Sequence, residues 1–144
     1  MKSTAILELM VRDHVKLLKY LTDVEEKLQK DPMAALPSFK IFEWNLEKHF
    51  FVEERAIFTS YNPEYVDEGY KIFLDLSKQH TAILEKLRVL KKDLQNNVVP
   101  DLTDFKNMLM KHKNYEEKNI YPVLDREIAW GEKRFIIERI NEII

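Results

Sequence analysis

Four stretches of this chain carry apolar residues at alternating spacings of three and four, and each has one histidine near the middle of its apolar face. That spacing places side chains on one side of an α-helix. Stripes of this length are buried most simply against one another, which predicts an all-α, up-down-up-down four-helix bundle with a short C-terminal helix. The four histidines are His14, His49, His80 and His112.

The limits of the helices follow from caps and prolines. The expected helical segments are 3–29, 37–60, 66–95 and 101–122. Ser3 is expected to cap the first segment, and Pro37 suits the first turn of the second. Either Asp101 or Thr103 begins the fourth segment, and Pro122 kinks or ends it.

Two further expectations concern the C-terminal part of the chain. The inward face of the fourth segment is expected to continue from Glu116 through Asn119 to Val123. After Gly131 a short amphipathic helix is expected to close the bundle. Its apolar residues are Phe135, Ile136, Ile140 and Ile144.

Composition narrows the class of protein. With 144 residues the chain fits one domain, residues 1–144. A net charge of −2 gives no basic stripe, so we expect no nucleic-acid partner. The absence of cysteine excludes disulfides and cysteine-ligated clusters. No apolar stretch approaches the roughly 20 residues of a membrane span, and early charges argue against a secretory signal, so we expect a cytoplasmic protein with no membrane partner.

Two histidines are each followed four residues later by a glutamate, giving His49-x-x-x-Glu53 and His112-x-x-x-Glu116. Residues four apart lie on the same helix face, so each pair projects an imidazole and a carboxylate inward. A buried carboxylate without a partner costs several kcal/mol, on the order of its desolvation penalty. Counting at about 1.5 Å per residue places the histidines within roughly a turn of one level. We therefore expect all six side chains to converge on a metal centre.

The ligand types narrow the choice of metal. Imidazole and carboxylate without thiolate suit iron, manganese or zinc. Four imidazoles and two carboxylates fit two metals, each held by two histidines, with Glu53 and Glu116 bridging and an oxide or hydroxide between the ions. The Glu-x-x-His signature of ferritin-like carboxylate sites is absent, which argues against that class.

These residues resemble a known family. His14, His49-x-x-x-Glu53, His80 and His112-x-x-x-Glu116-Glu117, followed by Ile120-Tyr121-Pro122, are similar to the hemerythrin-like (HHE cation-binding) family over about residues 3–126. The four-His, two-Glu arrangement is closest to the repair-of-iron-centres proteins and to the hemerythrin-like iron-sensing domain of an F-box protein. The resemblance implies two non-haem iron ions, oxo- or hydroxo-bridged.

The chain departs from the classical oxygen carriers of that family at two places. Where their third helix carries a second histidine, four residues after the first, this chain has Leu84. Their last ligand would fall on Glu117 instead of Glu116, so Glu117 either replaces or assists Glu116. The loss of a fifth histidine favours redox reaction over stable oxygen carriage.

The resemblance implies a protein that handles or senses oxygen, peroxide or nitric oxide, or that supports the repair of iron centres. The expected partner is a small diatomic gas or peroxide, and the expected assembly is a monomer or weak dimer. A reversible oxygen-binding hemerythrin and an iron-sensing regulatory module are the alternatives. Whether the protein is an enzyme stays open.

Overall fold

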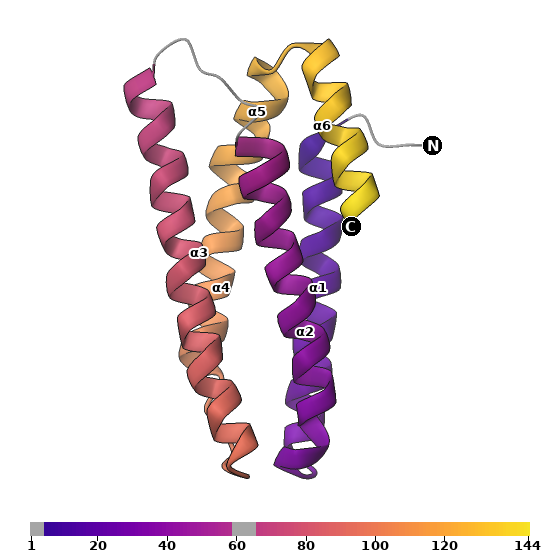
Figure 1. Ribbon diagram of the computed structural model, residues 1–144, viewed down its shortest axis with the longest axis vertical. Coiled ribbons are helices and arrows are strands. Elements are labelled where there is room, and N and C mark those ends of the chain that lie inside the picture. Colours follow the sequence, from indigo (N-terminus) through magenta and orange to yellow (C-terminus); the bar gives the residue numbers. More distant parts are fainter. Residues whose placement is uncertain (1–4, 59–65) are drawn as a thin grey trace.

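The computed structural model describes residues 5–58 and 66–144, with side chains from residue 72 onward in the second range. Apart from short connections between the helices, these ranges are helical and contain no strand. Figure 1 shows the long helices lying side by side along one axis and alternating in direction. The predicted all-α bundle is therefore confirmed. Its elements are α1 (Ile6–Leu28), α2 (Pro32–Val52), η1 (Glu53–Phe58), α3 (Val66–Gln95), α4 (Thr103–Tyr115), η2 (Glu116–Ile120), α5 (Tyr121–Glu127) and α6 (Trp130–Ile143).

The helix starts differ from the expected ones at two places. α2 begins at Pro32, five residues before Pro37, because the Asp31 side chain accepts a hydrogen bond from the Met33 backbone N–H at 3.1 Å and caps the helix. Pro37 therefore lies inside α2, where it removes one backbone donor. α1 begins at Ile6, and the expected cap Ser3 lies outside the described residues, as does the expected end at Ser60.

Hydrogen bonds close two further helix ends, the C-terminus of α3 and the N-terminus of α1. Asn97 has a φ of 58°, and Val98 and Asn97 donate backbone hydrogen bonds to the carbonyls of Asp93 and Leu94, a Schellman arrangement that ends α3. Asp125 of α5 accepts hydrogen bonds from the backbone N–H groups of Ile6 and Leu7, at 2.8 and 2.9 Å. The start of α1 is thus capped by a residue more than a hundred positions away.

Two π-helical turns interrupt the bundle helices, and each begins at one of the two inward glutamates, Glu53 and Glu116. A π-turn adds one residue to the helix, so every later side chain is rotated by about 100°. At η2 this rotation makes the expected inward position of Asn119 in the fourth segment wrong. Asn119 is exposed, and Ile120 and Tyr121 are buried in its place.

The apolar core is divided into two clusters along the bundle. The first lies toward the end that holds the N-terminus of α1 and includes Met10, Ile57 and Tyr121. The second lies toward the α1–α2 turn and includes Leu21, Phe42 and Phe105. The polar side chains of the candidate site lie on the same helices at sequence positions between those of the two clusters.

The C-terminal helix packs back onto the bundle. α6 contacts α1, α2 and η1, and buries Ile136, Ile137 and Ile140 in the first core cluster. Phe135, which was expected to be buried, is 63 % exposed because the covered face is centred on the isoleucines.

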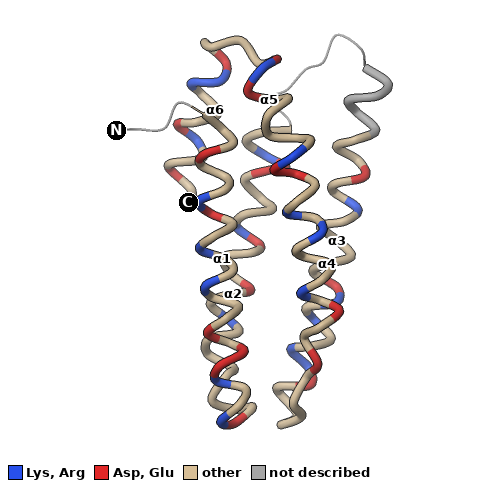
Figure 2. The backbone as a smooth tube through the Cα atoms, turned by 180° about the vertical axis from the view of Figure 1, so that it is seen from behind, with Lys and Arg blue, Asp and Glu red and all other residues tan. Residues whose placement is uncertain are grey.

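No helix in the described ranges is both long and apolar enough to cross a membrane. Figure 2 shows acidic and basic residues interspersed along the helices, without a long segment of one sign.

Candidate metal centre

The six residues singled out in the sequence come together in the middle of the bundle. α1 supplies His14, α2 supplies His49, α3 supplies His80 and α4 supplies His112, while Glu53 and Glu116 are the first residues of η1 and η2. All six side chains belong to residues that are between 0 and 5 % exposed. The expectation that one layer holds all of them agrees with these positions.

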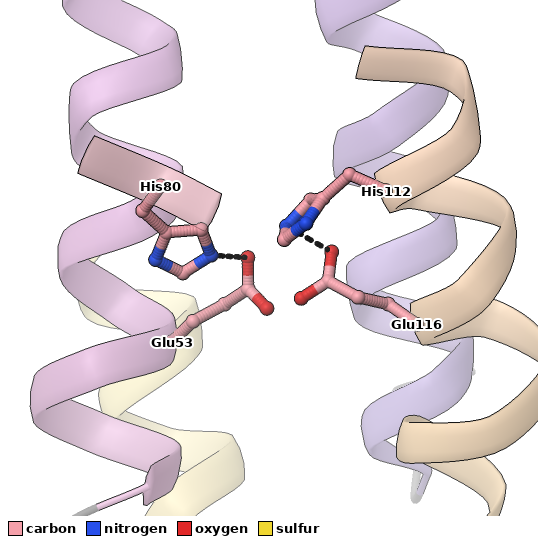
Figure 3. Close-up of side chains that lie close together, drawn as sticks. All are labelled: Glu53, His80, His112 and Glu116. Atoms are coloured by element: carbon pink, nitrogen blue, oxygen red, sulfur yellow. Dashed lines mark ion pairs between the residues drawn. The ribbon is translucent and has the colours of Figure 1, made fainter. Parts of the chain in front are cut away.

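Each glutamate faces histidines from two helices. Glu53 Oε1 lies 3.0 Å from His49 Nε2 and 3.6 Å from His80 Nε2. Glu116 Oε1 lies 3.2 Å from His112 Nε2 and 3.6 Å from His14 Nε2. Figure 3 shows the carboxylates of Glu53 and Glu116 facing each other, with the ring of His80 beside Glu53 and the ring of His112 beside Glu116. The Nε2 atoms of all four histidines therefore point at carboxylate oxygens.

Several of these atoms have no hydrogen-bond partner among the described residues, although they are buried. They are the Nε2 atoms of His49, His80 and His112, Oε1 of Glu53 and both carboxylate oxygens of Glu116. Buried polar atoms are nearly always paired, and leaving them unpaired costs free energy. Nitrogen and oxygen atoms that converge in this way are suited to a metal cation, which takes the place of any protons they carry.

The donor atoms form two overlapping groups. Glu53, His80, His112 and Glu116 can each place one ligand atom within 4.8 Å of the others, and so can His14, His49 and Glu116. Glu116 belongs to both groups. The arrangement could therefore hold two ions that share this carboxylate.

The outer ring nitrogens are held by a second set of residues. His14 Nδ1 lies 3.1 Å from Glu117 Oε2, and His80 Nδ1 lies 3.3 Å from Glu54 Oε1. Glu117 thus contacts the outer nitrogen of His14, whereas Glu116 faces the inner ones. These acceptors place the proton on Nδ1 and leave the Nε2 lone pair free for a metal.

The other two partners are Asp13 and Gln79, which sequence reasoning missed. His49 Nδ1 lies 2.6 Å from Asp13 Oδ2, and His112 Nδ1 lies 2.7 Å from Gln79 Oε1. Each precedes a histidine in the sequence but serves the histidine of the next helix. In the sequence, these two residues stand out only as polar residues next to an inward histidine. Which histidine each of them contacts depends on how the helices pack.

The four outer contacts form a closed ring around the bundle. α1 contributes Asp13 to His49 of α2, and η1, which continues α2, contributes Glu54 to His80 of α3. α3 contributes Gln79 to α4, and η2, which continues α4, returns Glu117 to α1. Three histidines therefore have a carboxylate partner, whereas the fourth has a neutral amide.

A fully buried tyrosine completes the cluster. The Tyr121 hydroxyl donates to Glu53 Oε2 at 3.2 Å and lies 3.4 Å from His14 Nε2. Sequence reasoning placed Tyr121 only in the Ile120-Tyr121-Pro122 motif and assigned it no contact. The extra residue of η2 turns this side chain inward.

Burial and neighbouring charges move the histidine pKa values in opposite directions. Burial disfavours the charged form of His49, but Glu53 and Asp13 outweigh it and raise the pKa of His49 to about 9. For His14, burial together with the charge of His49 lowers the pKa to about 4. Burial likewise lowers the pKa of His112 to about 4.

The two carboxyl groups are also unequal in the metal-free protein. Burial and the charge of Glu53 raise the pKa of Glu116 well above its usual value. Burial also acts to raise the pKa of Glu53, but the neighbouring carboxyl group of Glu116 and the charge of His49 lower it well below its usual value. Glu53 therefore gives up its proton more readily than Glu116, and cations that bind here would favour the release of protons from His49 and Glu116.

One side of the cluster adjoins a pocket of about 390 Å³ between α3 and α4. Gln79 and His112 line it, together with apolar residues such as Leu76 and Met108. A second hollow, which His14 and His49 line together with His112, has a volume of only about 10 Å³. A small molecule therefore has far more room beside His112 than beside His14.

Comparison with known proteins gives one family. The model of the hemerythrin HHE cation-binding domain matches residues 5–124. An uncharacterized hemerythrin-like protein of Schizosaccharomyces pombe is 25 % identical over 130 residues, which cover 89 % of this chain and 63 % of that protein. The chain thus spans less than two thirds of the length of this relative. No solved structure matches.

Proposed function

Because this chain belongs to the hemerythrin HHE cation-binding family, we propose that it is a non-haem di-iron protein. Its ligands are His14, His49, Glu53, His80, His112 and Glu116. The observation that carries the proposal is the set of buried nitrogen and oxygen atoms that face one another without hydrogen-bond partners. The grouping of these residues around two positions that share Glu116 supports a count of two ions.

The donor set by itself suits iron, manganese and zinc. The family relationship is what favours iron among them. Two irons would supply reversible one-electron chemistry and open coordination positions to this site. The protein's own residues do the rest. Glu54, Glu117, Asp13 and Gln79 fix the imidazole tautomers, and the two apolar clusters on either side exclude water.

The proposed partner is oxygen, peroxide or nitric oxide. A buried centre flanked by a largely apolar pocket suits a small, uncharged molecule. The four-His, two-Glu set with Leu84 in place of a fifth histidine is closest to the repair-of-iron-centres type, for which iron-centre repair is the associated role. We place the protein in the cytoplasm, as a single domain over residues 1–144 and as a monomer or weak dimer.

Metal analysis tests the proposal directly. Protein purified without oxygen should contain two irons per chain, and removal of the metal should lower its melting temperature. A ligand that binds only the folded form at a thousand times its Kd adds about 4 kcal/mol, which for this chain length corresponds to roughly 10 °C. Equal melting temperatures at pH 7 would contradict a buried ligand cluster.

A matched pair of variants tests the shared carboxylate. Glu116→Ala should lower iron content below that of the parent, because two neighbouring cations would lose the negative charge between them. Glu47→Ala, an exposed glutamate on α2, is the control and should keep two irons. Two irons in both variants would show that Glu116 does not hold the ions.

Reaction with small molecules separates the candidate roles. Rapid, irreversible oxidation by oxygen or peroxide supports a redox or repair function, whereas a persistent and reversible colour change under oxygen supports carriage. Protease resistance that depends on iron, without either reaction, supports an iron sensor.

A further inference from the structure

The two groups of candidate ligands are uneven. The first contains four residues, Glu53, His80, His112 and Glu116, whereas the second contains three, His14, His49 and Glu116. The second group is therefore the one that needs a further donor from the protein or from a small molecule.

The Tyr121 hydroxyl lies at the edge of this second group. Its oxygen is 3.4 Å from His14 Nε2 and 3.2 Å from Glu53 Oε2. Donor atoms about 2.1 Å from one ion and at right angles to each other are about 3 Å apart. The Tyr121 oxygen thus lies where a neighbouring ligand of the same ion would be expected.

The Tyr121 hydroxyl contacts only some of the candidate ligands among the described residues. The three histidines other than His14 have inner nitrogens without a hydrogen-bond partner among the described residues, as has Oε1 of Glu53. His14 Nε2 and Glu53 Oε2 are the two atoms that meet the tyrosine hydroxyl. A tyrosine side chain, unlike that of histidine or glutamate, combines an apolar ring that fills the core with an oxygen that can bind the ion.

Packing restricts where the Tyr121 oxygen can lie. The residue is fully buried in the first core cluster, and it follows directly after η2. The preceding π-turn and the Pro122 ring at the start of α5 restrict its backbone. The hydroxyl is therefore held against the site by the fold.

The group of Glu53, His80, His112 and Glu116 differs in its available donors and in the space beside it. Leu84, one turn after His80, offers no ligand atom, and the pocket of about 390 Å³ reaches His112. The large pocket reaches neither His14 nor His49, and the hollow that these two line together with His112 is about 10 Å³, too small for a further ligand of more than one or two atoms. Space and donors are thus distributed in opposite ways at the two positions.

We propose that Tyr121 is a seventh ligand of the metal centre, bound through its phenolate oxygen to the ion held by His14, His49 and Glu116. The hydroxyl proton is released to solvent when the oxygen binds. Tyr121 closes this position, so a small molecule binds at the other ion, which it reaches through the pocket between α3 and α4. The inference rests on the proposed di-iron function and extends it to the question of which ion reacts.

Spectra of the ferric protein test the ligand. Phenolate bound to iron(III) gives a charge-transfer band in the visible region, and excitation in that band enhances the ring vibrations of tyrosine in the Raman spectrum. Both signals should be present in the parent protein and lost in Tyr121→Phe, which keeps the ring and removes only the oxygen. Tyr20→Phe, at a half-buried tyrosine of α1, should keep both signals.

Titration with sodium azide tests the choice of ion. The parent should bind one azide per chain and Tyr121→Phe two, with two irons in each. Two irons without the charge-transfer band in the parent would overturn the proposal and leave Tyr121 as a hydrogen-bond donor to Glu53. A second azide in the parent would overturn it as well. Protein that binds no iron would instead contradict the di-iron function itself, so the two failures are distinguishable.

Discussion

The four histidines have similar partners at Nε2, which points into the bundle, and different partners at Nδ1, which points outward. Each inner nitrogen faces a carboxylate, but the outer nitrogens meet Asp13, Glu54, Glu117 and the neutral Gln79. A carboxylate partner makes an imidazole a stronger donor than an amide partner does. Of the two proposed metal positions, the one that includes His112 should therefore be the less electron-rich.

Asp13 makes the shortest of these outer contacts and is almost fully buried. Asp13→Asn keeps the shape but removes the charge that orients His49, so metal affinity should fall by about 10–100-fold, as for other outer partners of ligating histidines. Competition with a chelator measures the change. Asp23→Asn, on the exposed side of the same helix, is the control, and an equal loss in both variants would contradict the role given to Asp13.

Leu84 is the residue that separates this chain from a five-histidine site. It is half-buried and packs against the second core cluster, one turn after His80. In the proposed di-iron centre, Leu84→His would place an imidazole beside the ion assigned to His80 and His112 and would fill its open position. Oxidation of the reduced protein by oxygen should slow, as measured by stopped-flow absorbance. Leu84→Met, which keeps the volume and adds no imidazole, should oxidise at the parental rate.

At the scale of the helix, the two π-turns determine what reaches the site. Both begin at a glutamate whose side chain faces the inner nitrogens, and both add a residue just after it. The added residue in η2 moves Ile120 and Tyr121 into the core, where unbroken α-helix would have placed Asn119. The turn thus joins two helical segments whose apolar faces are out of phase.

Deletion of the exposed Asn119 tests this relation. Without the extra residue, η2 should become ordinary α-helix, and Ile120, Tyr121 and Leu124 should stay directed into the core because the two segments are then in phase. The free energy of unfolding should therefore stay within about 1 kcal/mol of the control, Asn119→Ala, since no large apolar side chain leaves the core. Urea unfolding measures both variants. A loss of several kcal/mol in the deletion variant would contradict the role of the π-turn as the place of one extra residue.

At the scale of the whole molecule, a polar layer lies between two apolar clusters and joins all the bundle helices. Its charges are unequal in the absence of metal, because the pKa of His49 is raised to about 9 while those of His14 and His112 are lowered to about 4. The stability of the metal-free protein therefore depends on pH in two opposite ways.

The metal-free protein should be most stable near pH 6.5. His14 and His112 stay neutral in the fold but gain protons in the unfolded chain below about 6.5, so stability falls as the pH drops from there toward 4. The contribution of His49 is fully present below about 6.5 and is lost as the pH rises through about 9. Melting temperatures in the presence of a chelator at pH 4.5, 6.5 and 9 measure the losses of stability at low and at high pH. A melting temperature that rises steadily to pH 9 would contradict a protonated His49.

The inward residues of the site follow from the sequence alone. A spacing of four places His49 with Glu53 and His112 with Glu116 on one helix face whatever the helix packs against, and the apolar stripes set which face is buried. The central position of each histidine and the shortness of the connections then place all six in one layer. The bundle itself is determined by the same local periodicity.

The surroundings of the site depended on tertiary structure. Asp13 and Gln79 reach histidines of other helices, so their roles depend on how neighbouring helices are rotated, which no spacing along one chain segment expresses. Tyr121 enters the site only because the π-turn adds a residue, and whether a helix forms such a turn is decided by the packing and by the buried glutamate that the turn accommodates. Local periodicity thus determined the donors, and packing between helices decided what orients and closes them.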